Sequence, residues 1–366
     1  MPYGLLVILL ALSAGAVGVA LRHEGHATTR PALVVHKPLR APDAGFAGYT
    51  LIGPVHQIQA EWSVPTIAAG SAIGHASTWI GVDDAQGDFI QLGTIEDKLG
   101  NLDPASYELF WTDTELGDLA HSLGQVHAGQ PVTVDMHQTS GGWVLTARVG
   151  HQRARAEFQS HYGGGVAFER SLWLQENPVL SLQPLRYKPY PTMSGVTLTG
   201  LEVNGAVPHL VFADAQALST SSLGSLAPTK VFFDAFRLLA PSGPTADYLH
   251  IVGGVDLALN QFFDALDSSR GPGQISAATR AAGLHAVAAI DDGNAALFAT
   301  AWPATARPAV SRFIEHNVGE ARDLTAWLTA RPADRSAAFV AFSTQSAGNG
   351  NYSDSIRAAL GLPPVH

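Results

Sequence analysis

The sequence predicts an all-β fold, a two-sheet antiparallel sandwich, followed by an α-helical C-terminal region. Over residues 45–240, short alternating apolar runs are separated by Gly, Pro, Asn and Asp, as at 131–136 and 196–203. This spacing is typical of antiparallel strands joined by turns. Over 241–366 alanine becomes frequent and apolar residues recur at three- and four-residue intervals, the period of a helix.

The N-terminal residues 1–22 form an apolar segment that predicts export. It has small-residue cleavage options after Ala16 or Ala20, as in a secretory signal peptide, and it is barely long enough for an uncleaved membrane anchor. Either alternative predicts a secreted or extracytoplasmic protein, which contacts a membrane only if the segment is uncleaved. Residues 23–44, rich in Pro, His, Arg and Ala, are expected to be a linker or a pro-segment.

Composition excludes several classes of function. Charged residues make up 14% of the chain, the formal net charge is -10, and there is no basic block, so no nucleic-acid partner is expected. A chain with few carboxylates loses fewer ion pairs on acidification, which suits an acidic medium. There is no cysteine, which excludes thiol catalysis and a disulfide framework.

Within the sandwich region, residues 78–94 read as two short strands joined by an acidic, glycine-containing turn. Alternation places Trp79 and Asp83 on the strand face opposite Ile80. The second strand carries a lone amide, Gln91, between apolar neighbours. On its own, Gln91 could equally bond to backbone at a sheet edge.

A later apolar run, residues 171–178, carries a carboxylate. Leu172, Leu174 and Glu176 share one face, so the carboxylate lies at the end of an apolar row. Partial desolvation there would help it accept or hold a proton. On its own, Glu176 could equally be a solvated strand end.

The helical region is expected to form a small bundle or antiparallel helices packed on the sandwich. Helices are expected around 249–266, 275–301, 308–328 and 353–360. Pro308 suits a first helical turn.

Several common sites are excluded. There is no G-x-S-x-G segment for an α/β-hydrolase serine and no D-T-G or D-S-G segment for an aspartic dyad. The histidines at 23 and 26 lack the i, i+4 spacing of a helical zinc motif, and the others are scattered. No metal and no cofactor are expected.

Six segments, in this order, match one pattern: G-F-A-G-Y at 45–49, A-E-W-S-V-P-T at 60–66, S-T-W-I-G-V-D at 77–83, F-I-Q-L-G-T at 89–94, G-Q-P-V at 129–132 and W-L-Q-E-N-P at 173–178. With these segments the chain resembles the glutamic peptidases, the eqolisin family. The resemblance implies a concanavalin-A-like sandwich, bent so that one face forms a substrate groove. It also implies an acid endopeptidase, a monomer acting on protein or peptide substrates.

The resemblance assigns the site residues. The catalytic dyad maps to Gln91 and Glu176. It implies direct attack by water, with Glu176 as the base and then the acid, while the Gln91 amide donates to the oxyanion and its carbonyl oxygen helps to orient the water. The residues expected to bind substrate on the groove face are Trp79, Asp83, Glu108 and Trp173.

The chain departs from the family pattern in two places. The strand after the glutamine is S-Y-E-L-F-W-T at 106–112, so either Glu108 or Thr112 occupies the family's acidic groove position. Strand parity leaves both open, because 108 and 112 share a face. Leu172 stands where the family has an acidic residue, which implies a less acidic groove.

Two other functions stay open. A concave sandwich face with Trp79 and Trp173 would suit a non-catalytic carbohydrate- or peptide-binding module. A glycosidase would need two carboxylates about 5–10 Å apart, with Asp83 or Glu108 supplying the second. The role of the helical region, 241–366, is not set by the sequence.

Overall fold

The computed structural model describes residues 45–84, 88–100, 103–117, 120–150, 152–158, 168–182, 185–219, 225–267 and 275–365. The predicted signal peptide or anchor and the predicted linker or pro-segment lie outside the described residues.

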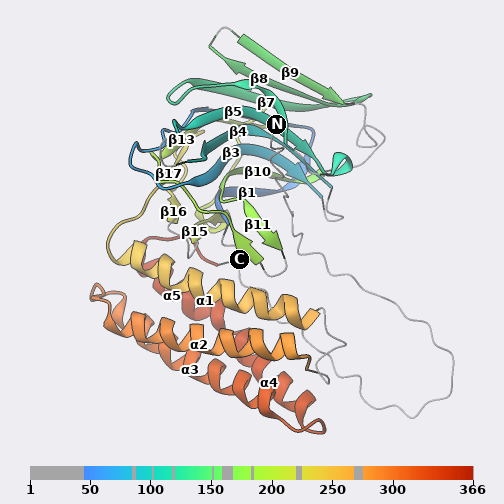
Figure 1. Cartoon of the computed structure of the whole chain (residues 1–366). Helices are drawn as coiled ribbons and strands as arrows, with labels where there is room; N and C mark the ends of the chain where they lie inside the picture. Colours follow the sequence, from blue (N-terminus) through green and yellow to red (C-terminus); the bar gives the residue numbers. More distant parts are fainter. Residues whose placement is uncertain are drawn as a thin grey trace, which may run out of the picture.

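Two large antiparallel sheets form the predicted sandwich (Figure 1). The described part of the first sheet has the order β14 (Ala215–Gln216), β1 (Phe46–Val55), β10 (Phe168–Glu176), β3 (Gly74–Asp83), β4 (Phe89–Lys98), β5 (Ser106–Asp113) and β6 (His121–Gln125). The second has the order β15 (Leu218–Ser219), β16 (Ser225–Pro228), β17 (Phe236–Leu239), β13 (Val196–Val203), β2 (Gln57–Ser63), β7 (Pro131–Thr139), β8 (Gly142–Val149) and β9 (Gln152–Phe158). A hairpin of β11 (Val179–Leu182) and β12 (Leu185–Tyr187) follows β10.

The first sheet is apolar on both faces. Its inner face contributes Tyr49, Ile80 and Trp173 to the core between the sheets, where they join residues of the second sheet such as Trp143. The outer face carries a separate buried cluster: Trp79, Phe89, Ile95, Phe110, Leu172 and Leu174. The alternation expected at Trp79 and Ile80 is therefore confirmed, and the outer face is a buried surface.

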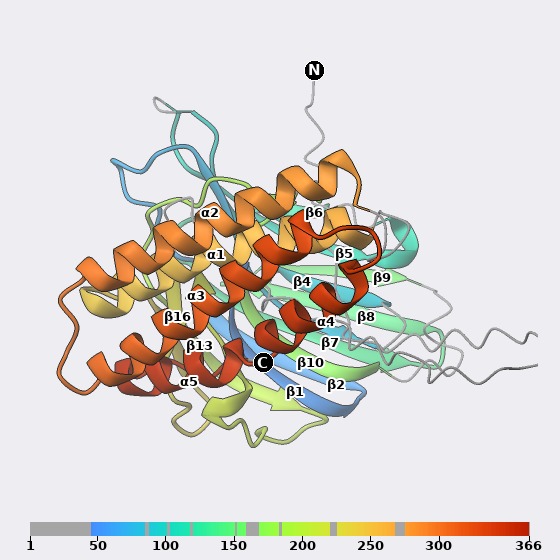
Figure 2. The same ribbon diagram turned by 90° about the horizontal axis from the view of Figure 1, so that it is seen from below.

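The C-terminal region folds into helices that lie beside the sandwich (Figures 1 and 2). They are α1 (Pro244–Asp267), α2 (Ala277–Ala299), α3 (Arg307–Thr329), α4 (Arg335–Ser346) and α5 (Asn349–Leu360). α1 contacts β12, β15 and β16, and α3 packs against α2, α4 and α5. Pro308 lies in the first turn of α3, as predicted, whereas α4 has no counterpart among the predicted helices. None of the described helices is long and apolar enough to cross a bilayer.

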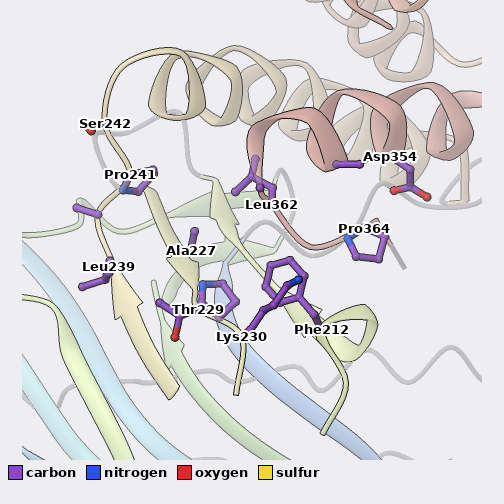
Figure 3. Close-up of a pocket in the computed structure, with 14 residues that line it drawn as sticks. Phe212, Ala227, Thr229, Lys230, Leu239, Pro241, Ser242, Asp354, Leu362 and Pro364 are labelled. Carbon is purple, nitrogen blue, oxygen red and sulfur yellow. The ribbon is translucent and has the colours of Figure 1, made fainter. Parts of the chain in front are cut away.

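A pocket of about 690 Å³ lies where the C-terminal end of the chain meets the sandwich (Figure 3). Its walls include Phe212, Leu239 and Leu362, and Lys230 places its ammonium 5.8 Å from the centre of the Phe212 ring. The lining residues come from both regions of the chain, so the sandwich and the helices share this pocket.

Asp256 on α1, which is partly buried, is expected to make the stability of the helical region depend on pH. Burial raises its pKa to about 7, with attraction from Arg357 partly opposing and repulsion from Glu320 adding to the rise. A carboxyl whose folded pKa exceeds its unfolded value contributes stability below about pH 4 and loses it as pH rises towards 7. We expect the free energy of unfolding to fall between pH 4 and 7, by up to about 1.4 kcal/mol per pH unit for this group.

Denaturant titrations of wild type and Asp256→Asn across this range check the expectation. The variant should show a shallower fall than the wild type. Asp247→Asn, which changes an exposed carboxylate in the first turn of the same helix, should leave the slope unchanged. Equal slopes in wild type and Asp256→Asn would show that Asp256 does not titrate in this way.

Candidate active site

Strand register places the two residues of the expected dyad on the outer face of the first sheet. Glu176 on β10 is the direct partner of Ser77 on β3. Gln91 on β4 is the direct partner of Gly81 on β3 and of Thr112 on β5. Both dyad side chains therefore face the same side, from the two strands that flank β3.

The carboxylate of Glu176 is held by two donors from β3. Its Oε2 accepts from the indole Nε1 of Trp79 at 2.9 Å and from Ser77 Oγ at 3.3 Å. Glu176 is 2% exposed. Two donors on one oxygen fix the orientation of the carboxylate, which a general base requires.

The amide of Gln91 is buried, and no described residue bonds to it. Both Oε1 and Nε2 lack a hydrogen-bond partner among the described residues, and so does Oγ1 of its neighbour Thr112. A buried polar group without a partner costs free energy, and such groups are uncommon in folded proteins. An amide retained at this cost, on the same face as a fixed carboxylate, points to a role in binding or catalysis.

Register also sets the separation of the dyad. Glu176 and Gln91 are two strands apart and offset by four residues, so on a flat sheet their Cα atoms lie about 10 Å apart across the strands and about 13 Å apart along them. Each side chain reaches roughly 5 Å, which leaves about 6 Å between the tips when they lean towards each other. About 6 Å is the span of a water and a carbonyl group, and the Gln91 amide does not bond directly to Glu176.

Trp79 connects the two halves of the site. Its Nε1 donates to Glu176. Its ring extends over Gly81, the cross-strand partner of Gln91. A Cβ on Gly81 would lie 2.9 Å from Trp79 Cζ3 and 2.9 Å from Phe89 Cε2. A Cβ on Gly93 would lie 2.2 Å from the Thr78 carbonyl oxygen and 2.5 Å from Trp79 Cβ. The two glycines thus make room for Trp79.

We expect Gly93→Ala to destabilise the protein by about 2–3 kcal/mol, because backbone cannot move away from the new methyl group as a side chain can. Thermal or urea unfolding measures the loss. Gly70→Ala, at a turn where a Cβ meets nothing within 4 Å, is the matched control. Unfolding free energies that agree for both variants would contradict this account of Gly93.

Asp83 is paired at the opposite end of the outer face. Its carboxylate, 1% exposed, accepts from Nε of Arg170 at 2.7 Å and from Nη2 of the same guanidinium. Burial raises the pKa of Asp83, and the hydrogen bond and charge of Arg170 partly reverse the rise. Asp83 is therefore half of an ion pair. Arg170 was not predicted from the sequence, although it shares strand parity with Glu176, which could have indicated a partner for Asp83.

The structure corrects the expectation that Trp173 lies on the groove face. Trp173 is fully buried in the core between the sheets, and its Nε1 donates to the Gln59 carbonyl oxygen at 3.2 Å. Successive residues of a strand point to opposite faces, so Trp173 must point away from the face of Glu176.

The register of β5 separates Glu108 from Thr112. Thr112 is the direct partner of Gln91 and is fully buried, whereas Glu108 is half-buried and lies opposite Ile95. A threonine therefore adjoins Gln91. Glu108, the acidic residue of β5 on the same face, lies four residues from Thr112, about 13 Å along the strand.

No group of three or more His, Asp or Glu side chains that could hold a metal ion occurs within the described ranges. The sequence-based expectation that the protein uses no metal or cofactor stays a prediction.

No protein-family model matches the sequence, and no curated protein matches it. Among solved structures, scytalido-glutamic peptidase with a transition-state analogue inhibitor matches at 15% identity and a TM-score of 0.45, covering 55% of this chain and 100% of that one. SCP-B, an eqolisin peptidase in complex with the tripeptide Ala-Ile-His, matches at 13% identity and a TM-score of 0.40 over 55% of this chain and 100% of its own. Aspergilloglutamic peptidase from Aspergillus niger matches at 18% identity and a TM-score of 0.35 over 46% of this chain and 99% of its own. At these identities and scores, assignment of function rests on the site itself.

Proposed function

We propose that this chain is an exported acid endopeptidase that hydrolyses peptide bonds with Gln91 and Glu176. The observation that carries the proposal is the buried amide of Gln91, which has no hydrogen-bond partner among the described residues. It lies on the same sheet face as the carboxylate of Glu176, which Trp79 and Ser77 hold in place. An amide that donates without titrating and a carboxyl that exchanges protons are complementary groups for hydrolysis in acid. Export is proposed from the apolar segment 1–22.

In the proposed reaction, Glu176 removes a proton from a water molecule, whose oxygen forms a bond to the carbonyl carbon of the peptide. The carbonyl oxygen becomes an oxyanion, which accepts a hydrogen bond from Nε2 of Gln91. Glu176 then gives its proton to the amine nitrogen as the C–N bond breaks. The products are a carboxylic acid and an amine, and no covalent enzyme intermediate forms.

The positions of the other carboxylates disfavour a glycosidase. Asp83 is six residues from Ser77, the cross-strand partner of Glu176, which is about 20 Å along the strands. Its carboxylate is also paired with Arg170. Glu108 lies level with Glu176 across the sheet, because Ser77 and Ile95 are the cross-strand partners between them, but it is three strands away, about 14 Å. Both separations exceed the roughly 5–10 Å that two-carboxylate glycoside hydrolysis needs.

A carbohydrate-binding module also has less support than the sequence suggested. Trp173 lies in the core, and Trp79 is 1% exposed, with its ring edge-to-face against Phe46 and Phe89. Neither indole presents an open face on which a sugar could stack.

Digestion of an unfolded protein substrate, scanned from pH 2 to pH 7 and read by mass spectrometry, tests the proposal. We expect internal cleavages that are frequent in acid and decline towards neutral pH. Glycan or peptide binding with no cleavage at any pH would instead establish the binding module.

A further inference from the structure

A charged cluster adjoins Glu176 at its end of the outer face. His75 on β3 and Asp97 on β4 are direct cross-strand partners, and His75 Nδ1 lies 2.9 Å from Asp97 Oδ1. Since His75 precedes Ser77 by two residues, it faces the same side as Ser77 and as Glu176, the partner of Ser77. The pair is mostly buried, with side-chain exposures of 16% for His75 and 9% for Asp97.

The third member of the cluster is Lys188, in the segment that follows β12. Its backbone N–H donates to the carbonyl oxygen of Pro178, two residues after Glu176, at 2.9 Å. The next residue, Pro189, accepts from the backbone N–H of His75 at 2.8 Å. These two bonds hold the Lys188 backbone between the end of β10 and the start of β3.

The ammonium of half-buried Lys188 interacts with two carboxylates. Burial lowers the pKa of Lys188, while attraction from Asp97 and then from Glu176 raises it. A nearby cation favours the ionised form of a carboxyl group, and a nearby carboxylate disfavours it. Lys188 therefore favours the ionised form of Glu176, whereas Asp97, which His75 contacts, would disfavour it.

We propose that Lys188 is a positioning residue for the reaction, whose ammonium offsets Asp97 and keeps Glu176 ionised in acid. This inference rests on the proposed function, in which Glu176 must be ionised to take a proton from water. Among the described residues, the other charged groups on this face are farther away. Glu108 lies about 14 Å along the same row, and the Asp83–Arg170 pair is at the opposite end.

The test compares Lys188→Met with Lys188→Arg. In Lys188→Met we expect the acidic limb of the kcat/KM profile to move to higher pH by roughly 0.5–1 unit, since the charge is partly screened by water. Activity on the acidic side should then fall about three- to tenfold relative to wild type, and high salt should reduce the difference. Lys188→Arg, which keeps the charge, should restore the wild-type profile, and Lys230→Met, at the remote pocket, should leave it unchanged.

A second measurement does not depend on activity. The carboxyl carbon of Glu176, assigned with Glu176→Gln in protein labelled with ¹³C-glutamate, is titrated by NMR in wild type and in Lys188→Met. A higher midpoint in Lys188→Met supports the inference even if no peptide is cleaved. Identical midpoints would overturn it, whereas absence of proteolysis by the wild type at every pH would contradict only the proposed function.

Discussion

Glu176→Gln is expected to abolish acid proteolysis, with kcat/KM reduced by at least about 10³-fold, within the range that general bases contribute. The substitution keeps the shape of the side chain and can still accept hydrogen bonds from Trp79 and Ser77, so the fold should persist. What it removes is the ability to take a proton from water and return it to the amine. The measurement is cleavage of a protein substrate at the acidic optimum of the wild type, with circular dichroism as the check on folding.

Gln91→Ala tests the other half of the dyad. Loss of one oxyanion donor typically costs roughly 3 kcal/mol of barrier, which corresponds to a decrease in kcat of a hundredfold or more. Because the side-chain amide of Gln91 makes no hydrogen bond to the described residues, its removal breaks no such bond of the folded protein. Glu169→Gln, which changes an exposed carboxylate on the same strand as Glu176, is the matched control and should keep full activity. Full activity in either dyad variant would exclude the proposed mechanism.

Arg170→Met is expected to cause the largest loss of stability, about 3–4 kcal/mol at neutral pH. Removal of one partner of a buried ion pair leaves the other charge uncompensated, and such losses are commonly about 3–5 kcal/mol. Arg170 is partly exposed, with 30% of its side chain accessible, whereas the Asp83 side chain is 1% exposed. The penalty therefore falls mainly on Asp83.

The loss should depend on pH in a defined direction. Without Arg170, the folded pKa of Asp83 rises further above its unfolded value, so stability decreases as pH rises above about 4 and recovers in acid. Urea unfolding of Arg170→Met at pH 3.5 and pH 7 measures this. The double variant with Asp83→Asn should regain stability at pH 7, and Arg237→Met, at an exposed arginine of β17, should change little. An equal loss at both pH values would show that the contacts of the Arg170 side chain matter more than its charge.

The sequence predicted the strands of the outer face well, because alternation is a local property. The placement of Trp79 opposite Ile80 followed from parity alone and is confirmed by the two separate apolar clusters. Parity could equally have excluded Trp173 from that face, since it is adjacent to Leu172 and Leu174. The resemblance, not the periodicity, suggested that Trp173 binds substrate.

The helix α4 shows where local signals were insufficient. It spans 12 residues, its N-cap Asp334 makes no side-chain capping bond, and its buried residues include Phe339 and Phe342. These phenylalanines pack against Trp327 of α3 and Phe262 of α1, respectively. A helix of this length is marginal by itself, so its stability comes from tertiary packing that a reading of the local sequence does not contain.

The sequence by itself determined the sandwich followed by helices and the faces of the strands, because these rest on residue type and on local spacing. The choice of Gln91 and Glu176 came from the resemblance of the ordered segments, and it stays a proposal. Only the tertiary structure decided which residues are neighbours across strands. Register placed Thr112 rather than Glu108 beside Gln91 and paired Asp83 with Arg170. These contacts join residues remote in sequence through hydrogen bonds between strands and the packing around them, and strand parity does not set that register.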